Sequence, residues 1–131
     1  MEYEGQVAME KLLSDSDATN MRFEFPTKSL KNFLMPVGQN YLKFVAMDML
    51  GQPRELKISV RNEGKHKKPW MSGQWRSYVL EKGLKKGDRV KLIIQVRENG
   101  GRIYRIKAER NLTMGMWIPI EEYWQARNGN N

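Results

Sequence analysis

The segment from Arg89 to Ala108 constrains the fold most, because it is typical of an antiparallel β-hairpin. Residues 89–96 (RVKLIIQV) and 102–108 (RIYRIKA) interleave polar and apolar side chains. A period of two places the apolar side chains of a strand on one face. The residues between the two runs, 98–101 (ENGG), favour a tight turn. The sequence therefore predicts two paired strands that share a buried face.

The same alternation recurs along the chain between turn and loop residues. We expect further strands at 7–12, 22–25, 41–48 and 55–61, and a polar loop at 14–20. Two short helices are expected between strands. The first begins at Thr27 as N-cap and ends by Pro36, with Leu30, Phe33 and Leu34 on one face; the second spans Ser72–Lys82, with Trp75, Tyr78 and Val79 on one face. About seven short strands and two short helices predict a mostly-β fold, a seven-stranded open or pseudo-closed β-barrel.

Positive charge is concentrated in one part of the chain. Lys and Arg total 23 against 15 Asp and Glu, a formal net charge of +8. Residues 54–89 contain 11 Lys and Arg, plus His66, against 4 acidic residues, a net of +7. A localised positive field suits a surface that binds polyphosphate. The alternative is that these lysines simply solvate the surface.

The composition argues against several other classes of function. There is no cysteine, which excludes disulfides and thiolate metal sites and suits a reducing compartment. The single histidine, His66, has no marked serine or carboxylate partner, and Asp15 with Asp17 is more typical of a solvated loop than of a cation site. No apolar run is long enough to span a membrane, and the N-terminus lacks a signal-peptide pattern. We therefore expect no enzyme activity, metal, cofactor, small-molecule substrate or membrane partner.

Three motifs, taken in order, are more specific than any one of them. They are residues 11–26, with KLLSDSDA followed by RFEFP; residues 47–51, MDMLG; and residues 72–90, with SGQWRSYV followed by LKKGDRV. This series resembles the plant-specific B3 DNA-binding domain of transcription factors and covers roughly residues 8–108. Gln74 and Ala18 depart from the family pattern, at positions of structural character.

The resemblance implies a seven-stranded DNA-binding pseudobarrel that grips the major groove of double-stranded DNA with two loop arms. The first arm would be residues 14–22 and the second residues 61–70. The resemblance, with the chemistry of these side chains, implies DNA contacts from Ser16, Thr19, Asn20, Arg22, Arg61, Asn62, Gly64, Lys65, His66, Lys67 and Lys68. Arg22 can equally stabilise a strand edge, and Trp75 is expected in the core. Trp70 is either a core aromatic, which is favoured, or a wedge against a sugar. Asp15 and Asp17 would repel phosphate unless they point away or hold basic neighbours.

Residues 1–110 are expected to form this domain, and residues 111–131 a C-terminal extension. The extension begins with an apolar stretch, 114–120, has a possible helical turn at 121–127, and ends in Asn128-Gly129-Asn130-Asn131, expected to be disordered. The apolar stretch either extends the core or is buried in a homodimer.

The leading hypothesis is a sequence-specific DNA-binding module of a plant transcriptional regulator, located in the nucleus. One alternative is a protein-interaction module whose basic loop binds an acidic partner. Another is a DNA-reading effector domain of restriction-endonuclease type, a class that normally accompanies a nuclease domain for which this chain has no room.

Overall fold

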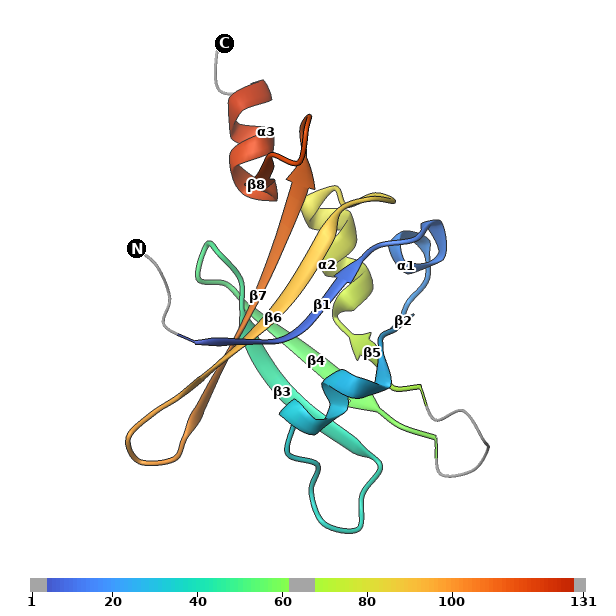
Figure 1. Cartoon of the computed structure of the whole chain (residues 1–131), viewed down its shortest axis with the longest axis vertical. Helices are drawn as coiled ribbons and strands as arrows, with labels where there is room; N and C mark the ends of the chain where they lie inside the picture. Colours follow the sequence, from blue (N-terminus) through green and yellow to red (C-terminus); the bar gives the residue numbers. More distant parts are fainter. Residues whose placement is uncertain (1–4, 62–67, 129–131) are drawn as a thin grey trace.

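A computed structural model describes residues 5–61 and 68–128 (Figure 1). The strands are β1 (Gln6–Leu12), β2 (Phe23–Glu24), β3 (Tyr41–Met47), β4 (Pro53–Ser59), β5 (Trp70–Gly73), β6 (Arg89–Val96), β7 (Arg102–Asn111) and β8 (Trp117–Pro119). The helices are α1 (Asp15–Thr19), α2 (Trp75–Lys82), α3 (Ile120–Asn128) and the 3₁₀ helix η1 (Thr27–Asn32). None of the helices in these two ranges is long and apolar enough to cross a membrane.

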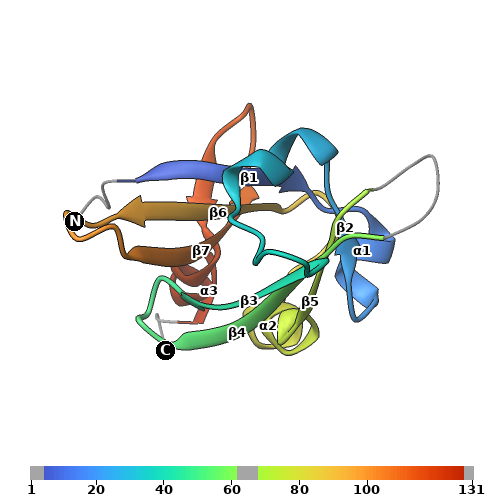
Figure 2. The ribbon, with the colours of Figure 1, turned by 90° about the horizontal axis from the view of Figure 1, so that it is seen from below.

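Seven strands form one curled sheet in the order β1-β6-β7-β3-β4-β5-β2 (Figure 2), and β8 adds to β7 (Figure 1). All neighbours are antiparallel except β3 and β7, which run parallel. Strands β1 and β2 end this order and do not pair with each other, so the barrel stays open. The predicted mostly-β, open seven-stranded pseudobarrel is confirmed.

The core fills the inside of the curled sheet. Alternate residues of β6, namely Val90, Leu92 and Ile94, point inward, as the period of two predicts. Trp75 and Tyr78 of α2 are fully buried in the same cluster. The predicted core position of Trp75 is therefore confirmed. Burial of these large aromatic and aliphatic side chains is the main stabilising contribution to such a small domain.

Several local predictions were wrong. Residues 15–19 form helix α1 instead of a loop, because Ser14 and Asp17 make a reciprocal capping box. Strand β5 covers the end of the expected second arm at Trp70 and the expected start of the helix at Ser72, and α2 begins at Trp75 instead. The first expected helix is 3₁₀, with Pro26 at its N-cap, and Leu34 is exposed.

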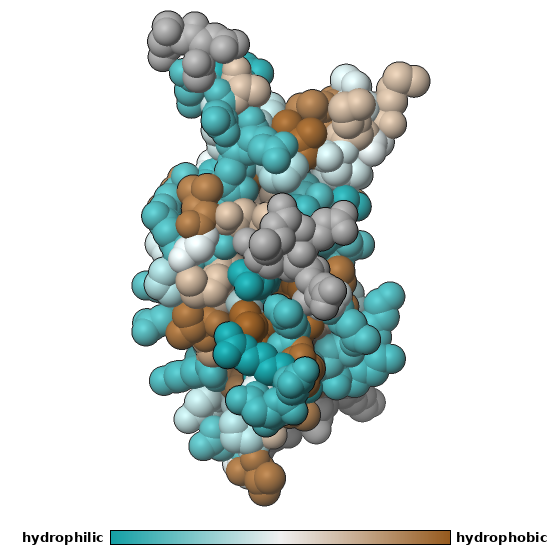
Figure 3. All heavy atoms as spheres, turned by 90° about the vertical axis from the view of Figure 1, so that its left-hand side faces the viewer, coloured by the Kyte–Doolittle hydropathy of each residue, from teal (hydrophilic) through white to brown (hydrophobic). Residues whose placement is uncertain are grey.

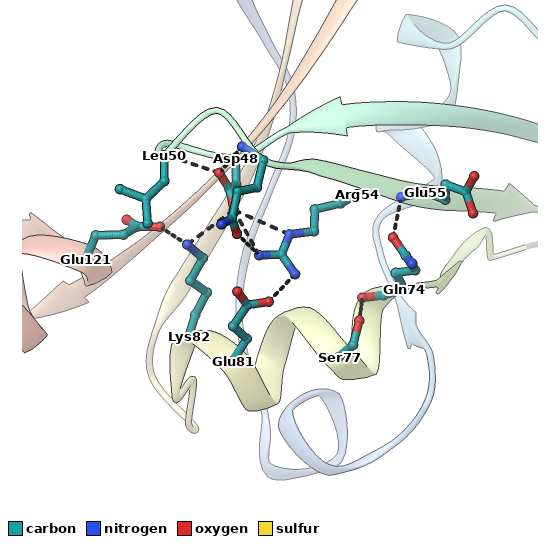
Figure 4. Close-up of polar contacts among 10 residues, drawn as sticks. Asp48, Leu50, Arg54, Glu55, Gln74, Ser77, Glu81, Lys82 and Glu121 are labelled. Carbon is teal, nitrogen blue, oxygen red and sulfur yellow. Dashed lines mark hydrogen bonds and ion pairs between the residues drawn. The ribbon is translucent and has the colours of Figure 1, made fainter.

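A buried ion-pair cluster joins α2 to the β3–β4 turn (Figure 4). Asp48 accepts hydrogen bonds from the backbone N–H groups of Leu50 (2.9 Å) and Gln52 (2.8 Å), which shapes the turn. Its other oxygen pairs with Arg54 (3.0 Å) and Lys82 (3.2 Å). Burial opposes the ionised form of Asp48, but the Gln52 N–H and the two cations outweigh it and lower the pKa of the carboxyl below its ordinary 3.8.

Residues after Asn111 pack on the same core. Ile120, at the start of α3, is fully buried, and Trp124 donates its indole N–H to the carbonyl of Lys82 at the end of α2 (2.8 Å). Asn128, expected to be disordered, belongs to α3. The turn between β7 and β8 instead exposes the apolar residues Leu112, Met114 and Met116, and Figure 3 shows an apolar projection at the upper end of the molecule.

Candidate nucleic-acid interface

A polar groove of about 400 Å³ lies between the two segments predicted to be arms. Helix α1 and the residues that follow it lie on one side, and Arg61 after β4 lies with Lys68 and Trp70 at the start of β5 on the other. The lining residues are Lys11, Ser14, Ser16, Asp17, Asn20, Arg22, Phe23, Glu24, Arg61, Lys68 and Trp70. Five of the residues predicted to contact DNA therefore line one groove: Ser16, Asn20, Arg22, Arg61 and Lys68.

Ser16 of α1 and Asn20, the residue that caps the C-terminal end of α1, both line this groove. The N–H of Asn20 donates to the carbonyl of Ser16 (2.9 Å). Both side chains are exposed. A hydroxyl and a carboxamide are short groups that can donate to and accept from base edges or phosphates. The wall is thus polar and suited to reading hydrogen-bonding groups.

One of the two acidic residues in this arm, Asp17, is neutralised inside the protein, whereas Asp15 is exposed and lies outside the groove lining. Asp17 is buried, accepts from the N–H of Ser14 (3.0 Å) and pairs with the ammonium group of Lys11 (3.0 Å). Lys11 also donates to the carbonyl of Glu24 on β2. Asp17 therefore faces its own capping box and a cation, which reduces the repulsion that a phosphate would meet here.

The bases of the two arms are joined directly. Strands β2 and β5 pair through Phe23 with Met71 and Glu24 with Trp70, and the N–H of Phe25 donates to the carbonyl of Pro69 (3.1 Å). The guanidinium of Arg22 also lies 5.0 Å from the centre of the Trp70 ring, a cation–π contact. Trp70 is thus a half-buried groove residue, and the prediction that it belongs to the core was wrong.

Arg61 and Lys68 are exposed at the groove, and neither has an ion-pair partner among residues 5–61 and 68–128. Other cations of the basic segment are used differently. Arg54 and Lys82 are buried in ion pairs, and Arg89 pairs with Glu109 (2.9 Å). The concentration of positive charge at 54–89 therefore overstates how much of it is available to a partner.

Of the remaining predicted residues the structure describes only Thr19, which is not part of the groove lining. Thr19 is exposed on α1, and its hydroxyl donates back to the carbonyl of Asp15 (2.8 Å). Asn62, Gly64, Lys65, His66 and Lys67 lie outside the described residues. In the part of the chain that is described, no three His, Asp or Glu residues gather as a metal site would require. Sequence reasoning missed Lys11 as a lining residue; its place near the Ser14 capping box is the signal that could have identified it.

Solved structures that are similar to this chain include two proteins bound to DNA. One is an Arabidopsis FUS3–DNA complex, with a TM-score of 0.64 and 18% identity over 82% of this chain and 100% of that one. The other is the Arabidopsis thaliana transcription factor LEC2 with DNA, with a TM-score of 0.65 and 18% identity over 79% of this chain and 92% of that one. The chain shares their fold. The B3-type pseudobarrel predicted from the sequence is thereby confirmed as a fold.

No protein-family model matches the sequence, and no curated protein matches it significantly.

Proposed function

We propose that this chain binds double-stranded DNA in a sequence-specific manner through two arms on either side of the groove. It would serve as the DNA-binding part of a plant transcriptional regulator in the nucleus, acting by contact and not by catalysis. The observation that supports this most directly is the groove itself, in which the exposed cations Arg61 and Lys68 share a lining with the polar side chains of α1. The same fold is bound to DNA in the FUS3 and LEC2 complexes.

The two walls suit different tasks. Arg61 and Lys68 would neutralise phosphates, which supplies affinity without base selectivity. Ser16 and Asn20 would reach base edges in the major groove, where each base pair presents a distinct set of donors and acceptors. We further propose that Asn62, Gly64, Lys65, His66 and Lys67, between Arg61 and Lys68 in sequence, complete the second arm's contacts, and that Thr19 contributes from the first.

Selection of bound duplexes from a random pool tests this function. The wild type should enrich one short motif, and its log–log salt dependence of affinity should have a slope of about −4 to −5, as expected for four to six neutralised phosphates. Asn20→Ala should relax the motif at one or two positions, since removing a side chain that bonds a base edge weakens discrimination by about 1–3 kcal/mol. Asn111→Ala, at an exposed asparagine outside the groove lining, is the matched control and should select the wild-type motif.

Each other outcome points to a different conclusion. Salt-sensitive binding without an enriched motif would mean a non-specific DNA binder. No duplex binding at all would favour a protein-interaction module whose basic groove binds an acidic partner, which titration with a polyglutamate peptide would detect. Binding that needs an added nuclease domain to become specific would favour the restriction-type effector hypothesis.

Self-association through the C-terminal residues is a separate proposal. Because Ile120 is buried in the core, cutting the chain after Arg110 would expose the core and would not test a dimer contact. The exposed β7–β8 turn is the better candidate, and Met114→Ser with Met116→Ser removes its apolar side chains. Light scattering at rising concentration should show a wild-type dimer that this variant does not form; a monomeric wild type rejects the proposal.

A further inference from the structure

Two consecutive residues of α2 hold the end of α1. The indole Nε1 of Trp75 donates to the carbonyl of Asp17 (2.9 Å), and Nη1 of Arg76 donates to the carbonyl of Ala18 (2.7 Å). Each bond joins residues 58 positions apart in the chain. The first arm is therefore attached to a helix that belongs to a distant part of the sequence.

These two hydrogen bonds stabilise the C-terminal end of α1. The last carbonyls of a helix have no partner within it, and a helix of five residues is too short to be stable on its own. Its N-terminal end is held by the Ser14 and Asp17 capping box. Its C-terminal end is held by α2, at the two carbonyls that lie between the groove residues Ser16 and Asn20 in sequence.

Helix α2 is a fixed support for this contact. Trp75, Tyr78 and Val79 are buried in the core. At its other end, Lys82 pairs with Asp48 (3.2 Å), and the side chain of Arg110 donates to the carbonyl of Gly83 (2.9 Å). A support that is anchored at both ends can set the position of α1 with little freedom.

We propose that Arg76 is a positioning residue that holds the first arm in its DNA-reading orientation without contacting DNA. Its side chain is half-buried, is bonded to Ala18, and is not part of the groove lining. Trp75 makes the parallel contact, but its burial makes any substitution a test of the whole fold. The inference rests on the proposed DNA-binding function. It states that Arg76 supports base selectivity by holding α1 in place and not by neutralising a phosphate with its charge.

The test compares Arg76→Gln with Arg97→Gln, which removes the same charge from an exposed site in the β6–β7 turn, distant from α1 (Figure 1). Arg76→Gln should relax the selected motif at the positions that respond to Asn20→Ala and weaken the best site by about 3- to 10-fold, as expected when one hydrogen bond is removed. Its salt slope should equal that of the wild type. Arg97→Gln should change neither the motif nor the slope.

A smaller salt slope, by about 0.9, would show that Arg76 neutralises a phosphate and would overturn the proposal. An unchanged motif would overturn it as well. Amide hydrogen exchange without DNA gives an independent measurement. The N–H of Asn20 should exchange faster in Arg76→Gln while the β6 amides keep their protection, which shows that the domain stays folded. Faster exchange in a protein that binds no duplex would reject the proposed function alone, whereas unchanged exchange would reject the role of Arg76.

Discussion

The groove beside the N-terminal end of α2 and the ion-pair cluster at its C-terminal end use the same kinds of charged residue for opposite purposes. At the N-terminal end, the groove presents Arg61 and Lys68, exposed and without ion-pair partners in the described part of the chain. At the C-terminal end, Arg54 and Lys82 are buried around Asp48, and Lys82 also pairs with Glu121 of α3 (3.0 Å). A count of positive residues treats these ends alike. Burial and pairing decide which cations stabilise the fold and which can bind a polyanion.

This difference assigns separate energetic roles to the two ends. Buried charges that lose their partner cost several kcal/mol, because the remaining ion keeps its desolvation penalty. Exposed cations contribute little to stability, since water already solvates them. The comparison therefore predicts that stability and DNA affinity respond to different substitutions.

Asp48→Asn should give the largest effect on stability. It leaves Arg54 and Lys82 buried without a full counter-charge, so the free energy of unfolding should fall by about 3–5 kcal/mol in urea titrations. The affinity of the folded protein for its DNA motif should stay within about twofold, since Asp48 lies outside the groove lining. Asp15→Asn, at an exposed carboxylate, is the control and should cost less than about 1 kcal/mol. An equal loss of unfolding free energy in both variants would contradict the different roles assigned to buried and exposed charges.

Low pH should have the next largest effect on stability, because it protonates the paired carboxylates Asp48 and Glu109. The pKa of Asp48 is lowered below 3.8, and that of Glu109 below 4.5 because Arg89, Lys91 and Lys107 outweigh the effect of its burial. A carboxyl with a depressed folded pKa stabilises the protein fully above its unfolded pKa, and this stability is lost as pH falls through the folded value. The urea midpoint should therefore stay level from pH 7 to about 5 and fall below pH 4.5.

Two variants divide this acid response between its sources. Asp48→Asn should flatten the part of the fall below pH 3.8, and Glu109→Gln the part that begins near pH 4.5. Each variant should therefore remove its own share of the fall and leave the other share in place. A fall that neither variant reduces would place the acid-sensitive groups elsewhere.

Much of the fold could be predicted from the sequence, because long alternating runs report directly on a strand with one buried face. The hairpin of β6 and β7 and that of β3 and β4 followed from this pattern. Short elements could not be predicted from this pattern, because α1 has five residues and β5 has four, too few to show a period. For α1 a local signal existed, since Ser14 followed by Asp17 three residues later is a capping-box pattern.

The candidate site could be predicted only in part, and through the family resemblance. It placed Ser16, Asn20, Arg22, Arg61 and Lys68 on two arms, and the structure brings these five to one groove. It did not indicate that Arg54 of β4 and Lys82 of α2 are buried in ion pairs with Asp48, because the fold brings α2 to the β3–β4 turn that contains Asp48. Pairing across a fold depends on tertiary geometry, which residue types and local spacing do not encode.

Removal of both groove cations should have the smallest effect on stability and a distinct effect on binding. Arg61→Gln with Lys68→Gln should change the free energy of unfolding by less than about 0.5 kcal/mol, as expected for exposed sites. The log–log salt slope of DNA binding should become shallower by about 2, roughly 0.9 for each phosphate that is no longer neutralised, while the selected motif stays the same. Arg97→Gln with Arg127→Gln removes two exposed charges outside the groove lining and should leave the slope unchanged. An equal change in both double variants would mean that the net charge of the whole domain governs binding, and the distinction between the two ends of α2 would then apply to stability alone.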